Sequence, residues 1–150
     1  MKKLTIVSIS ILGIFALYFA QSVVAERAEI EAAKVPLQNF IKSLETNQVE
    51  LIKKAFHKDG KVKYLYDGKL RTIEFNKYIA DFPKKPAKNE AKRKRWIESI
   101  EITGNVGVGK LILEYPSVKF TDYMTIMKID GEWKITNKTS HMELPKPAKK

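Results

Sequence analysis

Two ionisable side chains, Asp122 and His57, stand where they could carry acid–base chemistry. Asp122 alternates with Phe120 and Met124, and the period of two in a strand would place all three on one apolar face. Burial without a charged partner raises the pKa of a carboxyl group, which suits a general base or acid. The alternative interpretation is structural: Asp122 lies near a strand end and accepts hydrogen bonds from a turn, or it pairs with a lysine.

His57 follows the apolar side of an expected helix, where it could act as an acid–base group or donate a hydrogen bond to a ligand. In the alternative interpretation its positive charge caps the C-terminal end of that helix, where cations are favoured. His141 is expected beyond the last strand, in solvent. Two histidines this far apart, with no carboxylate at ligand spacing, predict no metal site. The sequence also has no Walker loop, dinucleotide fingerprint or Ser/His/Asp motif, so we expect no cofactor.

Three aromatic residues with polar tips are candidates for a ligand pocket: Tyr64, Trp96 and Tyr123. Each falls in an expected strand, and together they could line a pocket for a small flat or apolar ligand. Aromatic side chains on strands also build cores, with their polar tips reaching a partner. We assign Trp133 to the core and keep the other three as pocket candidates.

A basic segment between residues 84 and 95 contains seven cationic residues and one acidic residue, Glu90. We interpret it as an exposed loop that runs into a strand. It could bind an anionic envelope surface, such as a cell-surface polymer or lipid headgroups. Nucleic acid is not the expected partner, because stacking aromatic residues are not interleaved with the charges. The alternative is a solvated loop that binds nothing. The cationic residues are Lys84, Lys85, Lys88, Lys92, Arg93, Lys94 and Arg95.

The first 25 residues have the three parts of a secretory signal peptide. Residues 1–3 are positively charged, residues 4–20 are apolar, and residues 23–25 are small enough for signal peptidase. We therefore expect cleavage after Ala25 and export to the periplasm or the medium. Retention as a membrane anchor is the alternative, because the apolar run is at the lower limit of a span. The remaining 125 residues hold 26 basic and 17 acidic side chains, a net charge of +9, and no cysteine.

Helical patterns dominate the first part of the expected mature chain. Residues 26–35 should form a frayed helix start or a loose leader. A helix should begin at Pro36, where a missing N–H costs little, and apolar residues repeat with helical spacing over 37–44. Asn47 is the expected N-cap of a second helix, which ends at Asp59-Gly60.

Strand patterns dominate the rest. Asp67-Gly68 between two β-prone runs predicts a hairpin, and a short helix over 75–82 follows. Short turns then favour a consecutive antiparallel meander of four strands, over 96–103, 106–115, 118–129 and 133–139. Together these elements predict one α+β domain over residues 36–140, followed by a disordered basic tail over 141–150. A curved antiparallel sheet wrapped around the N-terminal helices would leave a cone-shaped pocket.

Short segments at ordered positions resemble a known family. They are residues 56–60 (FHKDG), 67–68 (DG), 100–106 (IEITGNV), 120–123 (FTDY) and 128–135 (KIDGEWKI). In this order they resemble the nuclear-transport-factor-2-like (NTF2-like) superfamily, with its SnoaL-like and ketosteroid-isomerase-like cone fold, and within it the bacterial "putative lumazine-binding" family. The resemblance implies that cone fold, and a homodimer through the open face of the sheet. It also implies a choice of functions, since this fold hosts isomerases, cyclases, dehydratases and binding modules.

Three functional interpretations follow. The first is an exported, non-catalytic module that binds a small apolar or aromatic ligand or serves in interactions, and we take it as the prediction. The second is an acid–base enzyme, an isomerase, cyclase or dehydratase, with Asp122 as base and Tyr64 or His57 as proton donor. The third is a basic protein that docks on an anionic envelope surface through residues 84–95.

Overall fold

The computed structural model describes the backbone of residues 2–144 and the side chains of residue 21 and residues 23–144. Contacts within the chain divide it into two units, residues 1–32 and residues 33–150. The predicted tail is described as far as Leu144, and the remainder of it lies outside the described residues. Among the residues whose side chains are described, no helical segment is both long enough and apolar enough to cross a bilayer.

Helix α1 (Lys2–Thr46) contains Pro36 in its interior, so the predicted helix start at Pro36 is wrong. The residues just before Pro36 are rich in alanine and glutamate, which are strong helix formers and extend the helix in the N-terminal direction. Ala33 is fully buried together with Leu37 and Phe40. The face of α1 that packs in the core therefore begins at Ala33, inside the segment expected to be a leader.

Asn47 has a left-handed backbone conformation, with a φ of 56°. Such a residue commonly ends a helix, and here it follows the last residue of α1. Its side-chain amide donates a hydrogen bond to the carbonyl of Pro83 at 2.9 Å. The N-cap position of helix α2 (Val49–Ala55) is occupied by Gln48. The prediction of Asn47 as that N-cap is therefore wrong.

Helix α2 is shorter than predicted, because the chain becomes extended at Phe56 and strand β1 (Phe56–Tyr66) begins there. The phenyl ring of Phe56 stacks on Phe75 with ring centroids 5.1 Å apart and meets Phe40 edge-on at 5.9 Å. This aromatic contact in the core outweighs the local helical pattern. His57 is consequently a strand residue, and the prediction that it caps a helix is wrong.

The predicted hairpin is confirmed. Strand β1 pairs with β2 (Lys69–Glu74) in antiparallel register, with Tyr66 opposite Lys69. Asp67 and Gly68 form the connection, with φ values of 51° and 70°, as a type I′ turn requires. Helix α3 (Phe75–Ala80) follows, and a single 3₁₀ turn, η1 (Glu90–Lys92), lies in the segment that leads to the next strand.

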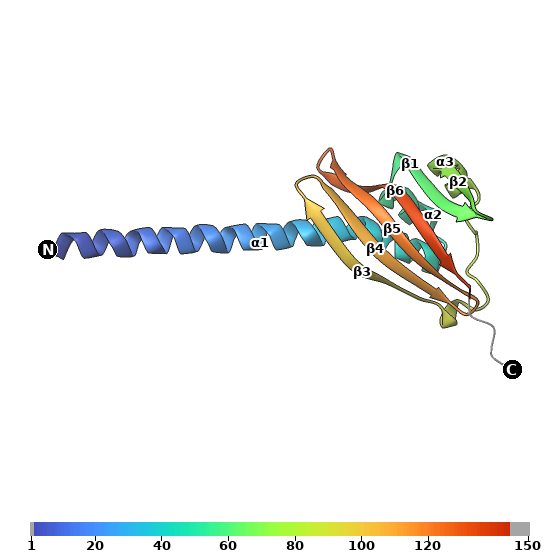
Figure 1. Cartoon of the computed structure of the whole chain (residues 1–150), viewed down its shortest axis with the longest axis horizontal. Helices are drawn as coiled ribbons and strands as arrows, with labels where there is room; N and C mark the ends of the chain where they lie inside the picture. Colours follow the sequence, from blue (N-terminus) through green and yellow to red (C-terminus); the bar gives the residue numbers. More distant parts are fainter. Residues whose placement is uncertain (1, 145–150) are drawn as a thin grey trace. The chain divides into compact units, whose positions relative to one another are not determined.

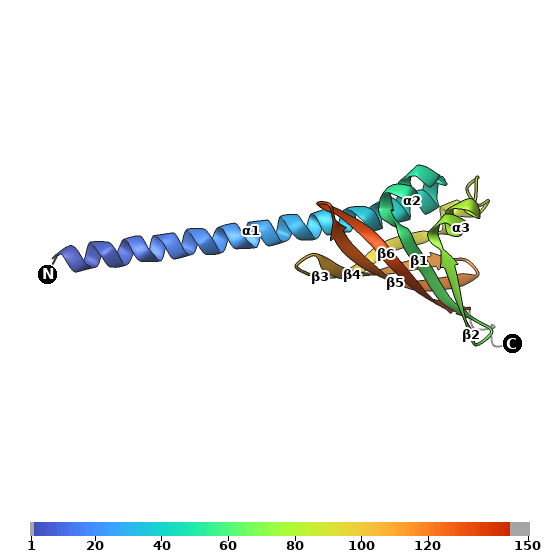
Figure 2. The same ribbon diagram turned by 90° about the horizontal axis from the view of Figure 1, so that it is seen from above.

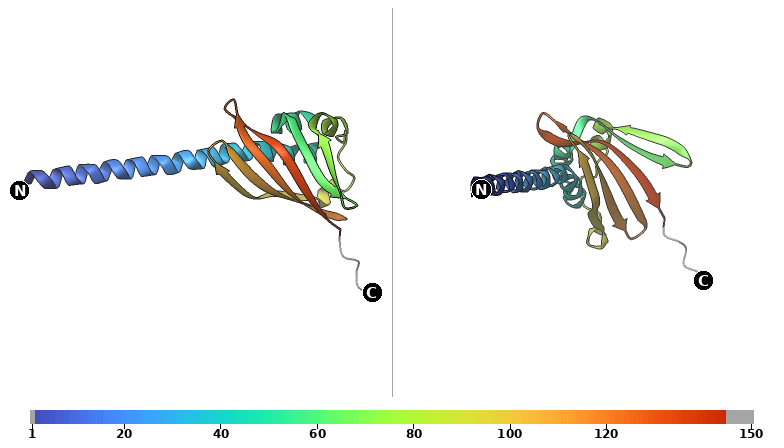
Figure 3. Two further views of the ribbon diagram at one scale, coloured as in Figure 1. Left: turned by 45° about the horizontal axis from the view of Figure 1, so that its top comes forward. Right: turned by 60° about the vertical axis from the view of Figure 1, so that its left-hand side comes forward.

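Within residues 2–144, six strands form one sheet in the order β2-β1-β6-β5-β4-β3 (Figure 1). The predicted meander is confirmed as β3 (Lys94–Thr103), β4 (Val106–Tyr115), β5 (Val118–Ile129) and β6 (Glu132–Glu143). Strand β1 adds to β6 in parallel. The sheet is curved (Figure 3) and mostly antiparallel, and the helices pack against it, which confirms the predicted α+β class. Because β6 continues past residue 139, His141 lies on a strand opposite Thr121, and its predicted place beyond the sheet is wrong.

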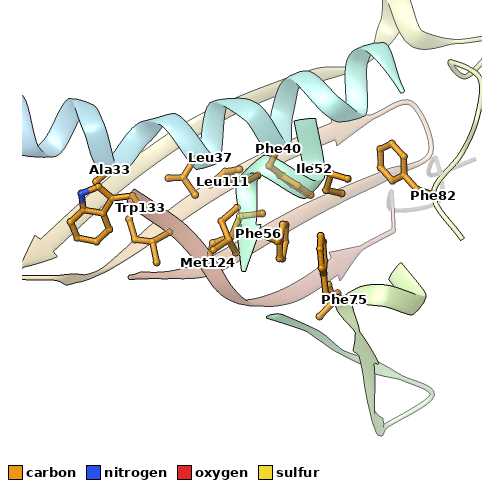
Figure 4. Close-up of a cluster of buried hydrophobic side chains, with 14 residues drawn as sticks. Ala33, Leu37, Phe40, Ile52, Phe56, Phe75, Phe82, Leu111, Met124 and Trp133 are labelled. Atoms are coloured by element: carbon orange, nitrogen blue, oxygen red, sulfur yellow. The ribbon is translucent and has the colours of Figure 1, made fainter. Parts of the chain in front are cut away.

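The core lies between α1, the short helices and the concave face of the sheet. Figure 4 shows Leu37 and Phe40 of α1 facing Leu111 and Met124 of the sheet. Close approach of the helix depends on Gly109, because a Cβ atom at this position would overlap the side chain of Leu37. Trp133 is buried in the same cluster, as predicted.

Candidate ligand cavity

A cavity of about 350 Å³ lies between α1, α3 and the concave face of the sheet. Its walls are mostly aromatic and aliphatic, and they come from both helices and from five strands. The lining residues are Phe40, Leu44, Val62, Tyr64, Leu65, Tyr66, Ile73, Tyr78, Leu113, Tyr115, Phe120, Lys138, Ser140 and Met142. The size falls within the range of small-molecule sites, and such sites are also mainly apolar with a few placed polar groups.

One charged side chain, Lys138, lies among these apolar walls. It is buried, with only 7% of its surface exposed. Its ammonium group donates a hydrogen bond to Oδ1 of Asp122 at 2.9 Å and another to the hydroxyl of Ser140. The Nζ atom also lies 5.9 Å from the centre of the Phe40 ring, within cation–π distance. Lys138 and Ser140 thus form the polar end of the cavity.

Asp122 is fully buried on the face of β5 that also carries Met124, where the alternation of the sequence places it. Its Oδ1 atom is held by Lys138, and no described group donates a hydrogen bond to its Oδ2 atom. Asp122 does not line the cavity, whereas its partner Lys138 does. Of the two interpretations made for Asp122, the geometry matches the pairing with a lysine.

Tyr78 adds a hydroxyl group to the cavity wall from α3. Burial raises the pKa of this phenol far above its usual value, and the negative charge of Asp122 and the neighbouring Tyr115 raise it further. Tyr78 therefore keeps its proton at any physiological pH. It can serve the cavity as a hydrogen-bond donor and not as a base.

Tyr64 lines the cavity, whereas the other two aromatic candidates do not. Tyr123 lies between Asp122 and Met124 on β5, so it points to the opposite, open face of the sheet and is 50% exposed. Trp96 is opposite Ile112 on that same open face, and its indole N–H donates to Glu98 at 2.7 Å. The predictions of Trp96 and Tyr123 as pocket residues are therefore wrong, because strand alternation turns both away from the concave face.

His57 also lies away from the cavity. Its Nδ1 atom accepts a hydrogen bond from the backbone N–H of Asp59 at 3.3 Å, and the Asp59 carboxylate is 3.7 Å away. His57 and Tyr64 are therefore not brought together with Asp122 into one site. The acid–base arrangement considered for these residues is not assembled in this geometry.

The basic segment divides into structural arginines and exposed lysines. Arg95 is buried, and both of its amino groups donate to the carboxylate of Glu90, one at 3.1 Å. Burial alone would lower the pKa of Arg95, but its hydrogen bonds to Glu90 and Tyr115 raise it. Arg93 stacks over the Tyr115 ring at 4.3 Å. The expectation of an exposed loop therefore fails for both arginines, while the lysines remain exposed: Lys84, Lys85, Lys88, Lys92 and Lys94.

Lys138, the residue that gives the cavity its polar end, was not among the sequence candidates. Strand β6 contains an irregularity, because Thr125 pairs with Asn137 while Ile126 pairs with Ile135. The extra residue in β6 reverses the alternation beyond it. If the alternation continued unbroken from Ile135, Asn137 would lie on the concave face. The bulge places Lys138 there instead. The only sequence signal for a functional role of Lys138 was its position as a charged residue within a β-prone run.

Comparisons with known proteins agree with this geometry. A family model described as "Putative lumazine-binding" matches residues 28–141. The aldolase FrzH of Cladobotryum sp is 24% identical over 116 residues, which cover 76% of this chain and 91% of that protein. An NTF2-like protein of unknown function from Shewanella baltica has a TM-score of 0.70 at 18% identity, covering 79% of this chain and 96% of that one.

A second NTF2-like protein of unknown function, from Methylobacillus flagellatus, has a TM-score of 0.66 at 28% identity, covering 77% of this chain and 93% of that one. These likenesses agree on the cone fold, and the family match spans most of the chain. The chain belongs to the "Putative lumazine-binding" family of the NTF2-like superfamily.

Proposed function

We propose that this protein is an exported binding module that holds a small, neutral, largely aromatic molecule in the cavity between α1, α3 and the sheet. The observation that carries the proposal is an apolar cavity of about 350 Å³ with one polar end, at Lys138 and Ser140. Its volume is roughly twice that of an engineered cavity that admits benzene. A ligand of about two fused rings fits this space.

The polar end favours a hydrogen-bond acceptor without a net charge. The ammonium group of Lys138 has three N–H donors, of which Asp122 and Ser140 take two. The third is available to a ligand oxygen. Because Asp122 already neutralises Lys138, an anionic ligand would bring an uncompensated charge into the cavity. A ketone, ester or quinone oxygen meets the requirement without that cost.

The same lining does not support acid–base catalysis. The described residues that line the cavity include no carboxylate and no imidazole, and Tyr78 is held in its protonated form. The relative from Cladobotryum is named an aldolase. Aldol chemistry at a lysine requires a free amine that attacks a carbonyl, whereas the amino group of Lys138 donates hydrogen bonds to Asp122 and Ser140. We therefore do not extend that activity to this chain.

Native mass spectrometry tests whether the cavity holds a ligand. The chain from Glu26 onward retains every buried core residue, because the core begins at Ala33. We expect this chain, purified from a bacterial periplasm, to carry additional non-covalent mass. The measurement is then repeated after excess 2-acetylnaphthalene has been added to the protein. Absence of bound mass in both would contradict a ligand-binding cavity.

A matched ligand series tests the polar end. 2-Acetylnaphthalene has an acceptor oxygen, 2-ethylnaphthalene has none, and 2-naphthoate is charged. The ketone should bind roughly 10- to 100-fold more tightly than the hydrocarbon, since a hydrogen bond to a charged donor contributes about 1.5–3 kcal/mol. The preference should vanish in the double variant Lys138→Met/Asp122→Leu and persist in Tyr123→Phe, which lies on the open face. Tighter binding of the naphthoate would refute the neutral-ligand assignment.

We also propose that the chain is exported with cleavage after Ala25. The charged, apolar and small-residue parts of the first 25 residues support this. The intact mass of protein from the periplasm of an expression host gives the test. A chain that begins at Glu26 is expected, whereas a full-length membrane-bound chain would support the anchor interpretation.

A homodimer through the open face of the sheet is the third part of the proposal. Four partly exposed apolar side chains support it: Trp96, Val106, Val108 and Tyr123. Exposed apolar side chains that share one face of a sheet are typical of interaction sites. Light scattering should give the mass of two chains, and Tyr123→Glu/Val108→Glu should reduce it to one. A wild-type monomer at micromolar concentration would refute the dimer.

A further inference from the structure

Five exposed apolar residues gather where the β1–β2 hairpin meets the end of β6, and we call them the rim. Strand β1 runs parallel to β6 with Tyr64 opposite Ser140, so the turn of this hairpin and the C-terminal end of β6 lie at the same end of the sheet (Figure 2). The exposed fractions are high for side chains of this type. They are Leu65 66%, Tyr66 60%, Leu70 66%, Met142 45% and Leu144 70%. Exposed apolar groups in such a cluster indicate a contact surface.

The rim forms one end of the ligand cavity. Leu65, Tyr66 and Met142 all line the cavity while remaining exposed to solvent. Leu70 extends this surface, because it pairs with Leu65 across the hairpin. An apolar ligand that leaves or enters the cavity at this end would pass over apolar side chains.

Apolar groups cover both faces of the hairpin end. Leu65 and Leu70 form one cross-strand pair, and Tyr66 and Lys69 form the next. Successive pairs in a sheet point to opposite faces, so the leucines lie on one face and the tyrosine on the other. A flat protein surface would cover one of these faces. A lipid headgroup layer surrounds an inserted hairpin end and covers both.

Cationic side chains accompany the rim. Lys69 lies opposite Tyr66 and Arg71 lies opposite Tyr64, and both cations are exposed. In the part of the chain that the structure describes, neither Lys69 nor Arg71 has an acidic partner. The hairpin end between residues 64 and 71 contains one acidic residue, Asp67, and two basic residues, Lys69 and Arg71. Its net charge is therefore positive. Anionic headgroups complement this charge, and long cationic side chains can keep their charge at the interface while the rim inserts.

We propose that the rim docks on an anionic bilayer surface, so that the cavity exchanges its ligand with the membrane. The proposal places membrane contact at the hairpin end and not at the lysines of residues 84–94. Docking of the rim can be tested without a ligand, whereas the exchange of ligand with the membrane rests on the proposed binding function.

Vesicle co-sedimentation with the chain from Glu26 onward tests this docking. The vesicles contain phosphatidylglycerol mixed with phosphatidylcholine, and pure phosphatidylcholine vesicles serve as the comparison. We expect binding to the anionic vesicles that weakens with salt. The double variant Leu65→Ser/Leu70→Ser should bind at least about tenfold more weakly, because it loses the apolar insertion. The control variant Val35→Ser removes an exposed apolar group that lies outside both the rim and the proposed dimer face, and it should bind as the wild type does.

A second pair of variants separates the two basic regions. Lys69→Gln/Arg71→Gln should weaken binding about fivefold for each charge removed, whereas Lys84→Gln/Lys85→Gln should leave it unchanged. Equal effects of both pairs, or equal effects of the leucine and valine variants, would overturn the assignment to the rim. Loss of dimer mass in the leucine variant would show that the rim is a protein interface instead, and would also overturn it. Ligand binding measured on the same variants distinguishes this failure from failure of the cavity proposal.

Discussion

Replacing Lys138 by methionine would leave the carboxylate of Asp122 buried without a cationic partner. The two side chains are 91% or more buried and 2.9 Å apart, and Oδ2 of Asp122 has no described hydrogen-bond donor to compensate. Removing one member of such a pair costs about 3–5 kcal/mol. Methionine has a similar volume and is tolerated by the apolar walls, so the cost arises from the charge and not from a void.

The expected loss is a large share of the total stability. A domain of this size unfolds with a free energy of about 5–15 kcal/mol. A loss of about 4 kcal/mol corresponds to a fall in Tm of roughly 15 °C. The double variant Lys138→Met/Asp122→Leu removes both charges, and it should lie within about 1.5 kcal/mol of the wild type. The coupling between the two sites should therefore amount to several kcal/mol.

Urea unfolding at neutral pH, followed by tryptophan fluorescence and circular dichroism, measures these differences. Lys84→Met is the matched control, because Lys84 is exposed and should change stability by less than about 0.5 kcal/mol. The reasoning is refuted if Lys138→Met costs no more than the control. It is also refuted if the double variant is as unstable as the single one, since packing and not charge would then be responsible.

Three further changes follow from the structure. Gly109→Ala should lower the free energy of unfolding by about 1–3 kcal/mol, because its Cβ is forced against Leu37. In the double variant with Leu37→Ala, part of this loss should disappear. Strictly additive losses in the two single variants would contradict the contact. Folding raises the pKa of Tyr78 above its unfolded value near 10.0, so the protonated phenol stabilises the folded state fully below that pH. This stabilisation is lost as the pH rises above it. Stability should thus decline at alkaline pH less steeply in Tyr78→Phe than in the wild type, and parallel declines would exclude the effect. Glu90→Gln should lower Tm by several degrees, because the buried Arg95 side chain loses its carboxylate partner. Thermal unfolding measures this change against the exposed control Glu98→Gln. Equal melting temperatures for the two variants would show that Arg95 does not depend on the ion pair.

Local chemistry determined much of this fold. Asp67 and Gly68 can both adopt the positive φ of a type I′ turn, so the hairpin follows from two adjacent residues. Alternation within β4 and β5, bounded by turn residues, predicted both strands at their observed limits. The same alternation placed Asp122 on the buried face. These features depend on nearest neighbours in the chain, and the sequence contains all the information they require.

Tertiary structure decided the remaining features. The helix end at Ala55 depends on packing of Phe56 against rings that come from α1 and α3. The Arg95 side chain can be buried because it donates hydrogen bonds to Glu90, on the 3₁₀ turn before β3, and to Tyr115, at the end of β4. Lys138 reaches the cavity because a bulge in β6 reverses the alternation, and Asp122 on the adjacent strand then compensates its charge. These contacts join residues from different elements, so they depend on how the elements pack and on the position of the bulge in β6, and not on the local pattern of residues.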